Sequence, residues 1–161
     1  MDWISTVAGK LGLAGGGGTP LRIGEPGPTP SDVVDQDGAP VSFHEAYESG
    51  PVFVYFYWKA STPVCTAHSC QLRDDFEILE EMGVQVFGVS PDGSAAQKKF
   101  QVKNGLPFRL IADVEGKVAA AFRVPTVFKM PARRAFLIRN GRVIWAGAAG
   151  PKGFEQMSAL L

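Results

Sequence analysis

Apolar runs and amphipathic stretches alternate along the chain from Leu21 onward, and this alternation predicts strands that are each followed by a helix. The longest apolar run covers residues 52–58 (VFVYFYW) and predicts a central strand that is buried on both faces. A helical pattern then covers residues 62–83, where Thr62 is the expected N-cap, Pro63 the first helical residue and Gly83 the stop signal. The chain is therefore predicted to run from a buried strand directly into a long helix.

Further elements follow from the same kinds of pattern. In chain order they are a small hairpin about Asp37 and Gly38, a buried strand at 84–90, a helix at 95–104 capped by Ser94, a strand at 108–112, a short helix or turn at 114–122, a hairpin about Asn140 and Gly141, and a closing helix at 154–161. Strands that alternate with helices before a terminal hairpin and helix are typical of an α/β fold with a mixed central sheet. The parallel part of such a sheet needs right-handed crossovers.

The chain divides into a short tail and one domain. Residues 15–18 are GGGG and predict a flexible linker, so residues 1–20 are expected to form an N-terminal tail and residues 21–161 a single domain. Asp2 stands where a signal peptide carries positive charge, and no long apolar segment follows it. With only two cysteines, the chain also lacks the pattern of a secreted disulfide scaffold, and we expect a cytoplasmic location.

The charge balance argues against nucleic-acid and membrane partners. The 16 basic and 16 acidic residues give a formal net charge of zero, whereas binding to phosphates or anionic lipids needs an excess of positive charge. The apolar run at 52–58 is far shorter than the roughly 20 residues that span a bilayer. No long exposed strand edge is evident in the pattern, which favours a monomer.

The stretch STPVCTAHSC, residues 61–70, holds both cysteines at the start of the predicted helix. Cys65 lies in the first turn, where unpaired backbone N–H groups and the helix dipole favour a thiolate, and Cys70 lies deeper without that help. Three interpretations stay open: a redox pair, two inert buried thiols, or a metal site that includes His68. The metal site is disfavoured because the chain has only two Cys and two His, and structural zinc takes four ligands at recurring spacings.

The segment YFYWKASTPVCTAHSC resembles the active-site segment of peroxiredoxins, in particular the Q-type or bacterioferritin comigratory protein subgroup of the AhpC/TSA family. The shared pattern is Thr-x-x-Cys with a second cysteine five residues later, and the resemblance extends over residues 21–147 through DQDGAPVSF, PVFVYFY, QLRDDF, VQVFGVSPD and ARRAFLIRNGRV. It implies a thioredoxin-like sandwich with an N-terminal β-hairpin extension. It also implies a thiol peroxidase that reduces hydrogen peroxide and organic hydroperoxides without metal or organic cofactor and is recycled by thioredoxin or a similar dithiol.

The same resemblance implies roles for four residues. Cys65 corresponds to the peroxidatic cysteine and Cys70 to the resolving one, so a Cys65–Cys70 disulfide is implied. Thr62 corresponds to the residue that hydrogen-bonds the peroxide or the thiolate. The family's essential arginine lies three residues before a Phe-Leu-Ile strand core, and here that residue is Arg133. Arg134 is expected to point to the other face of the strand.

The spacing of the two cysteines restricts when this disulfide can form. Five residues along an ideal helix place the two Cα atoms about 8.6 Å apart. A disulfide needs Cα atoms closer than about 7 Å with Cβ atoms that face each other. We therefore expect the helix to unwind around residues 66–69 on oxidation.

Two residues depart from the Q-type pattern. Trp58 stands where the family usually has proline, and His68 stands where it often has a glutamate that helps to hold the arginine. Two other functions are retained as alternatives, namely a redox sensor with little turnover and a thiol–disulfide oxidoreductase. The oxidoreductase is disfavoured because Thr62 occupies the position of the first cysteine in a CxxC motif.

Overall fold

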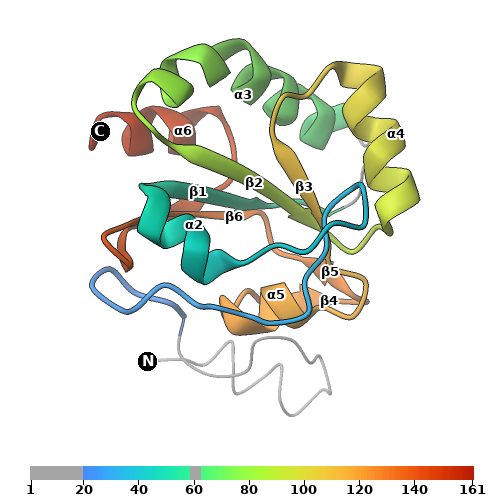
Figure 1. Ribbon diagram of the computed structural model, residues 1–161, viewed down its shortest axis with the longest axis horizontal. Coiled ribbons are helices and arrows are strands. Elements are labelled where there is room, and N and C mark those ends of the chain that lie inside the picture. Colours follow the sequence, from blue (N-terminus) through green and yellow to red (C-terminus); the bar gives the residue numbers. More distant parts are fainter. Residues whose placement is uncertain (1–19, 59–62) are drawn as a thin grey trace.

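A five-stranded mixed sheet forms the centre of the computed structural model, which describes residues 20–58 and 63–161. Its strands are β1 (Val52–Phe56), β2 (Gln85–Ser90), β3 (Arg109–Ala112) and β6 (Arg134–Arg139), which Figure 1 labels, together with β7 (Arg142–Ala148). The strand order is β3-β2-β1-β6-β7, with β1, β2 and β3 parallel to one another and β6 and β7 antiparallel to their neighbours. The predicted α/β sandwich around a mixed sheet is confirmed.

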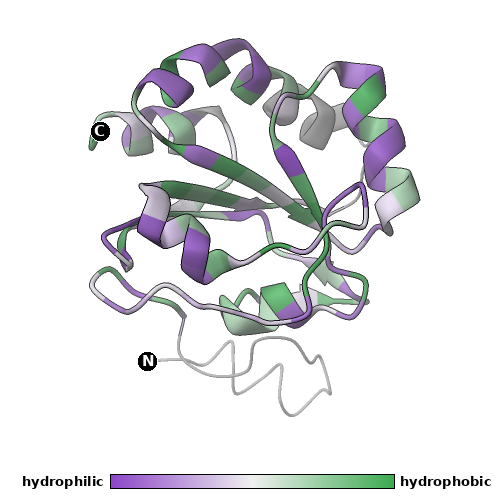
Figure 2. Ribbon diagram, in the orientation of Figure 1, coloured by the Kyte–Doolittle hydropathy of each residue, from purple (hydrophilic) through white to green (hydrophobic). Residues whose placement is uncertain are grey.

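Helices cover both faces of the sheet (Figure 1). One face carries α3 (Pro63–Glu81), α4 (Ser94–Asn104) and α6 (Pro151–Ser158), and the other carries α2 (Phe43–Ser49) and α5 (Lys117–Ala121). Figure 2 shows the consequence for hydropathy, since the central strands are mostly apolar whereas polar and apolar residues alternate along α3 and α4.

The side chains of β1 supply both halves of the core. Phe53 and Tyr55 pack with the residues of α3, α4 and α6, whereas Val52, Val54 and Phe56 pack with those of α2 and α5. All five side chains are fully buried. The absence of polar residues in this run is thus explained by a strand with no solvent-facing side.

Two elements were not predicted from the sequence. Helix α2 begins after Ser42, whose hydroxyl accepts a hydrogen bond from the backbone N–H of Glu45, so a Ser-x-x-Glu capping box marks it in the sequence. The small hairpin of β4 (Thr126–Val127) and β5 (Met130–Pro131) turns through Phe128 and Lys129, which both have positive φ. Neither turn residue is a glycine or asparagine, so the usual turn signal is missing there.

Two predicted helix boundaries were wrong. Ser94 does not cap α4, because Gly93 is the N-cap and the Ser94 hydroxyl donates instead to the carbonyl of Asp35. The closing helix α6 begins at Pro151, in the favourable first helical position, and ends at Ser158 rather than running from 154 to 161. The hairpin about Asp37 and Gly38 is present as a single antiparallel bridge between Val34 and Pro40.

The predicted tail falls on residues that the structure does not describe, so the domain boundary near residue 21 stays a prediction. No described helix combines the length and the apolar character that a membrane span needs.

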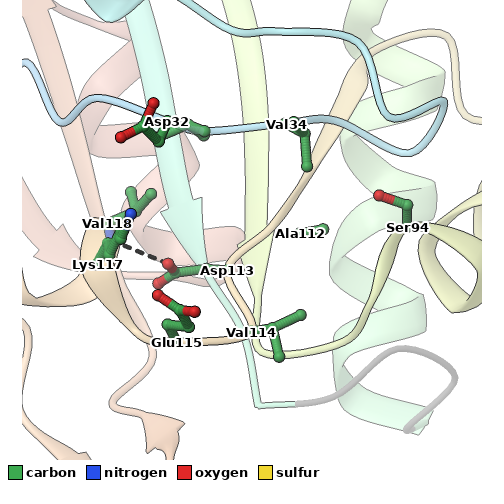
Figure 3. A pocket seen from close by; sticks show the side chains of 10 residues that line it. Asp32, Val34, Ser94, Ala112, Asp113, Val114, Glu115, Lys117 and Val118 are labelled. Atoms are coloured by element: carbon green, nitrogen blue, oxygen red, sulfur yellow. Dashed lines mark hydrogen bonds between the residues drawn. The ribbon is translucent and has the colours of Figure 1, made fainter.

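Asp113 holds α5 in place beside a surface hollow of about 250 Å³ (Figure 3). Its two carboxylate oxygens accept the backbone N–H groups of Val118 and Ala119, each at 3.0 Å. Burial raises the pKa of the Asp113 carboxyl, and the N–H groups of the first turn of α5 partly oppose this rise. Among the described residues that line the hollow there is neither Cys70 nor Arg133, and we assign Asp113 a structural role.

We expect Asp113→Ala to lower the free energy of unfolding by about 1–2 kcal/mol, because two buried N–H groups lose their acceptor. The pKa of Asp113 is higher in the folded chain than in the unfolded chain. Its contribution to stability is therefore fully present at low pH and declines as the pH rises through the folded pKa. Urea titrations should accordingly give a larger loss for the variant near pH 4 than at pH 7.

Glu77→Ala, at an exposed position of α3, is the control and should leave the urea midpoint nearly unchanged. A loss that grows with rising pH in Asp113→Ala would contradict the raised pKa.

Candidate active site

The predicted cysteine site lies where β1 leads into α3. Helix α3 begins at Pro63, as the sequence predicts, and Cys65 is its third residue. Thr62 lies outside the described residues, and of Cys65 and His68 the structure describes only the backbone. Cys65 therefore occupies the first helical turn, where the unpaired N–H groups of the helix are found. The expected roles of Thr62 and His68 stay predictions.

Helix α3 runs unbroken through both cysteine positions. It ends at Glu81, and Gly83 follows with a φ of 74°. The N–H of Gly83 donates to the carbonyl of Glu80 and that of Val84 to the carbonyl of Leu79, which is a Schellman ending. Because the helix is continuous, Cys65 and Cys70 keep the helical separation of about 8.6 Å. This separation is too long for a disulfide.

The side chain of Cys70 is a half-buried free thiol that contacts the end of α4. Its Sγ donates to the Oδ1 of Asn104 at 3.7 Å. Asn104 is fixed in turn, because its Nδ2 donates to the carbonyl of Phe100 at 3.0 Å and its own carbonyl accepts Nη1 of Arg73 at 2.7 Å. Through Asn104, the thiol of Cys70 is thus tied to the last turn of α4.

Ser69, immediately before Cys70, ties the same turn of α3 to the sheet. Its Oγ shares a hydrogen bond of 2.8 Å with the hydroxyl of Tyr55 in β1, and both residues are fully buried. Ser69 belongs to the segment that is expected to unwind on oxidation. Unwinding would therefore break a buried hydrogen bond between α3 and β1, at a cost of about 1 kcal/mol.

A second buried network joins the carboxyl ends of the parallel strands. The hydroxyl of Tyr57 donates to Oε1 of Gln97 at 2.5 Å, and Nε2 of Gln97 donates to Oγ of Ser90 and to the carbonyl of Ile111, each at 2.9 Å. Burial raises the pKa of Tyr57 well above its ordinary value, so this hydroxyl stays protonated. The network holds the edge of the sheet from which α3 departs.

Arg133 lies at that same edge, because β6 is antiparallel to β1 and Ala135 pairs with Tyr55. The Cζ of Arg133 stands 4.8 Å from the ring centroid of Trp58, which is a cation–π contact. The Nε of Arg133 is buried and has no hydrogen-bond partner in the described part of the chain. A guanidinium donor is thus available next to the start of α3.

Sequence reasoning singled out Cys70, Arg133 and Trp58 but missed the polar residues that hold the turn around Cys70 and the nearby edge of the sheet. The residues that it missed are Tyr55, Ser69, Arg73, Gln97 and Asn104. Tyr55 belonged to an apolar run and the others to polar helix positions, which are ordinarily solvated. Nothing in their spacing marks them, since the partners of Ser69 and Cys70 lie 14 and 34 positions away.

Comparison with known proteins identifies the family. The model of the AhpC/TSA family matches residues 23–146. Peroxiredoxin Q, chloroplastic, of Sedum lineare is 36% identical over 119 residues, which are 73% of this chain and 63% of that protein. Peroxiredoxin Bcp of Escherichia coli strain K12 is 39% identical over 105 residues, which are 65% of this chain and 66% of that protein. The chain thus spans less than two thirds of the length of these curated relatives.

A solved structure agrees with this assignment. Peroxidoxin BcpB from Mycobacterium tuberculosis superposes with a TM-score of 0.70 at 27% identity, and the match covers 84% of this chain and 99% of that one. The expected resemblance to the Q-type and Bcp peroxiredoxins is therefore confirmed. Because the family model covers most of the chain, the protein belongs to the AhpC/TSA family.

Proposed function

We propose that this chain is a thiol peroxidase that uses Cys65 as the attacking thiolate and Cys70 as the resolving thiol. The observation that carries this proposal is Arg133, with its buried, unpartnered Nε, at the edge of the sheet where α3 begins. The position of Cys65 in the first turn of α3 and the similarity to peroxiredoxins support it further.

In the first step the Cys65 thiolate attacks one oxygen of the hydroperoxide, the O–O bond breaks, and the other oxygen leaves as an alkoxide or hydroxide that takes up a proton. Cys65 is oxidised to a sulfenic acid. The Cys70 sulfur then attacks the Cys65 sulfur, its proton goes to the departing hydroxide, and a disulfide and water form. A dithiol protein of the thioredoxin type would reduce this disulfide by exchange and itself be oxidised.

Activation of the thiolate alone cannot account for a fast first step. A thiol of pKa about 8.5 is about 3% ionised at pH 7, so lowering its pKa by about 3 units gains roughly 30-fold in thiolate. The intrinsic nucleophilicity falls by about 20-fold over the same change, which nearly cancels the gain. The rate must therefore come from alignment of the peroxide and from stabilisation of the charge on the departing oxygen. In this proposal Arg133 and Thr62 supply both.

Replacement of Arg133 by Gln should slow peroxide reduction by about 100-fold, because one charged donor to the departing oxygen is lost. Stopped-flow reduction of hydrogen peroxide measures the rate, and the absorbance of the Cys65 thiolate at 240 nm measures its pKa. The rate should fall far more than the pKa change explains. Arg134→Gln, at the first residue of β6, is the matched control and should stay near wild type. A rate loss proportional to the pKa change would contradict this role.

The two cysteine variants should fail at different steps. We expect Cys65→Ser to lose peroxide reduction entirely, because no other sulfur starts the reaction. Cys70→Ser should reduce one equivalent of peroxide and then stall as a sulfenic acid in the presence of thioredoxin. A peroxide assay with mass measurement of the trapped sulfenic acid tests both outcomes. Sustained thioredoxin-dependent turnover by Cys70→Ser would remove Cys70 from the mechanism.

Removal of the Tyr55 hydroxyl should speed up the resolving step. Disulfide formation needs the turn around Ser69 to open, and Tyr55→Phe deletes the buried hydrogen bond that opposes this opening. A hydrogen bond of about 1 kcal/mol corresponds to a roughly fivefold faster conversion of sulfenic acid to disulfide. Rapid acid quench and mass spectrometry after one equivalent of peroxide follow this conversion.

Tyr47→Phe is the matched control for this experiment. Tyr47 donates a comparable hydrogen bond of 2.6 Å to the carbonyl of Pro28, on the other side of the sheet. The control should lower global stability without changing the rate of disulfide formation. Equal rates for wild type and Tyr55→Phe would show that the turn around Ser69 does not open before the disulfide forms.

A redox sensor is the second candidate function. Cys70 and Ser69 are both held by side chains outside α3, so the helix resists opening. Slow formation of the disulfide after oxidation of Cys65 would suit a sensor better than a peroxidase. Many turnovers of peroxide with a thioredoxin-type reductant would favour the peroxidase. A single stoichiometric oxidation would favour the sensor.

Location and assembly stay predictions. The plant relatives are named as chloroplastic, so the expected cytoplasmic location of this chain is not supported by its relatives as a group. The expected monomer is testable by light scattering.

A further inference from the structure

The indole of Trp58 stands over the guanidinium of Arg133, with 4.8 Å between Cζ and the ring centroid. Trp58 directly follows Tyr57, whose backbone N–H donates to the carbonyl of Val89 and keeps this part of the chain on the sheet. Trp58 is 44% exposed, so its side chain combines the contact with Arg133 with substantial exposure to solvent. Packing in the hydrophobic core therefore does not explain why a large aromatic residue stands at this position.

Arg133 has no carboxylate partner within the described residues. Its buried Nε also lacks a hydrogen-bond partner there. Its backbone is fixed, because the carbonyl of Arg133 accepts the N–H of Ala149 at 3.1 Å. Among the described residues, the ring of Trp58 is therefore the contact that orients the guanidinium of Arg133.

A ring and a carboxylate hold an arginine in different ways. A carboxylate occupies the N–H donors and offsets the positive charge, whereas an aromatic face attracts the cation and leaves its in-plane donors unused. An arginine that must stabilise charge on a departing oxygen gains from the second arrangement, because its full charge and its donors remain available.

We propose that Trp58 is the positioning residue of Arg133 and keeps its guanidinium aligned for the peroxide while leaving its donors free. This inference rests on the proposed peroxidase function. It gives a role to the tryptophan that departs from the Q-type sequence pattern, in a chain where His68 replaces the glutamate of that pattern.

The test is a double-mutant cycle with Trp58→Leu and Arg133→Gln, scored by kcat/KM for hydrogen peroxide. A cation–π contact at a half-exposed site predicts a roughly tenfold lower kcat/KM for Trp58→Leu. Trp58→Phe keeps an aromatic face and should recover activity to within about threefold of wild type. In the Arg133→Gln background, Trp58→Leu should cause no further loss, because there is no cation left to orient.

A purely structural role for Trp58 would give the same loss in both backgrounds, and that result would overturn the inference. Equal activity of Trp58→Leu and wild type, or a Trp58→Phe variant as poor as Trp58→Leu, would also overturn it. Far-UV circular dichroism checks that each variant is folded. Absence of peroxide turnover in the wild type would instead overturn the proposed function, so the two failures are distinguishable.

A second readout does not depend on activity. Ring current from Trp58 should shift the proton resonance of the Arg133 Nε–H upfield in an NMR spectrum of the reduced protein. Trp58→Leu should remove this shift, and Trp58→Phe should keep part of it. An Arg133 Nε–H resonance at the same position in wild type and Trp58→Leu would show that the ring does not hold the guanidinium.

Discussion

The burial of β1 on both of its faces is the constraint on which the rest of the structure depends. Its five residues, from Val52 to Phe56, have no exposed side, so helices must cover both faces of the sheet. Parallel pairing with β2 and antiparallel pairing with β6 then bring the start of α3 and the residue Arg133 to the same edge. The strand carries no reactive group, yet it decides which groups can meet.

Much of this architecture was predictable because its signals are local. Continuous apolar runs identified the central strands, and Gly83 and the Asn140-Gly141 turn identified two chain reversals. The hairpin at Phe128 and Lys129 was not predictable in this way, because both residues adopt positive φ without the sequence that normally allows it. Packing of the surrounding chain, rather than intrinsic preference, must stabilise that turn.

In the candidate site, too, the sequence predicts the local features but not the contacts between distant segments. The spacing of the cysteines and the start of the helix can be read from one short segment. The same segment predicts that the helix must unwind before the two cysteines can form a disulfide. The contacts that oppose this change, from Ser69 to Tyr55 and from Cys70 to Asn104, join segments that are distant in the sequence. Such contacts depend on the tertiary structure, so no single-sequence pattern announces them.

The two ends of α3 differ in how they are held. Its later turns are secured by fully buried Leu72 and Leu79 and by the Schellman ending at Gly83, whereas Ser69 and Cys70 make polar contacts with Tyr55 and Asn104. Opening of the turn around Ser69 and Cys70 therefore breaks these two contacts, while Leu72 and Leu79 can stay packed in the core. Changes elsewhere in the core can raise the melting temperature while leaving these two contacts in place, so heat resistance and the pace of the redox cycle can evolve independently.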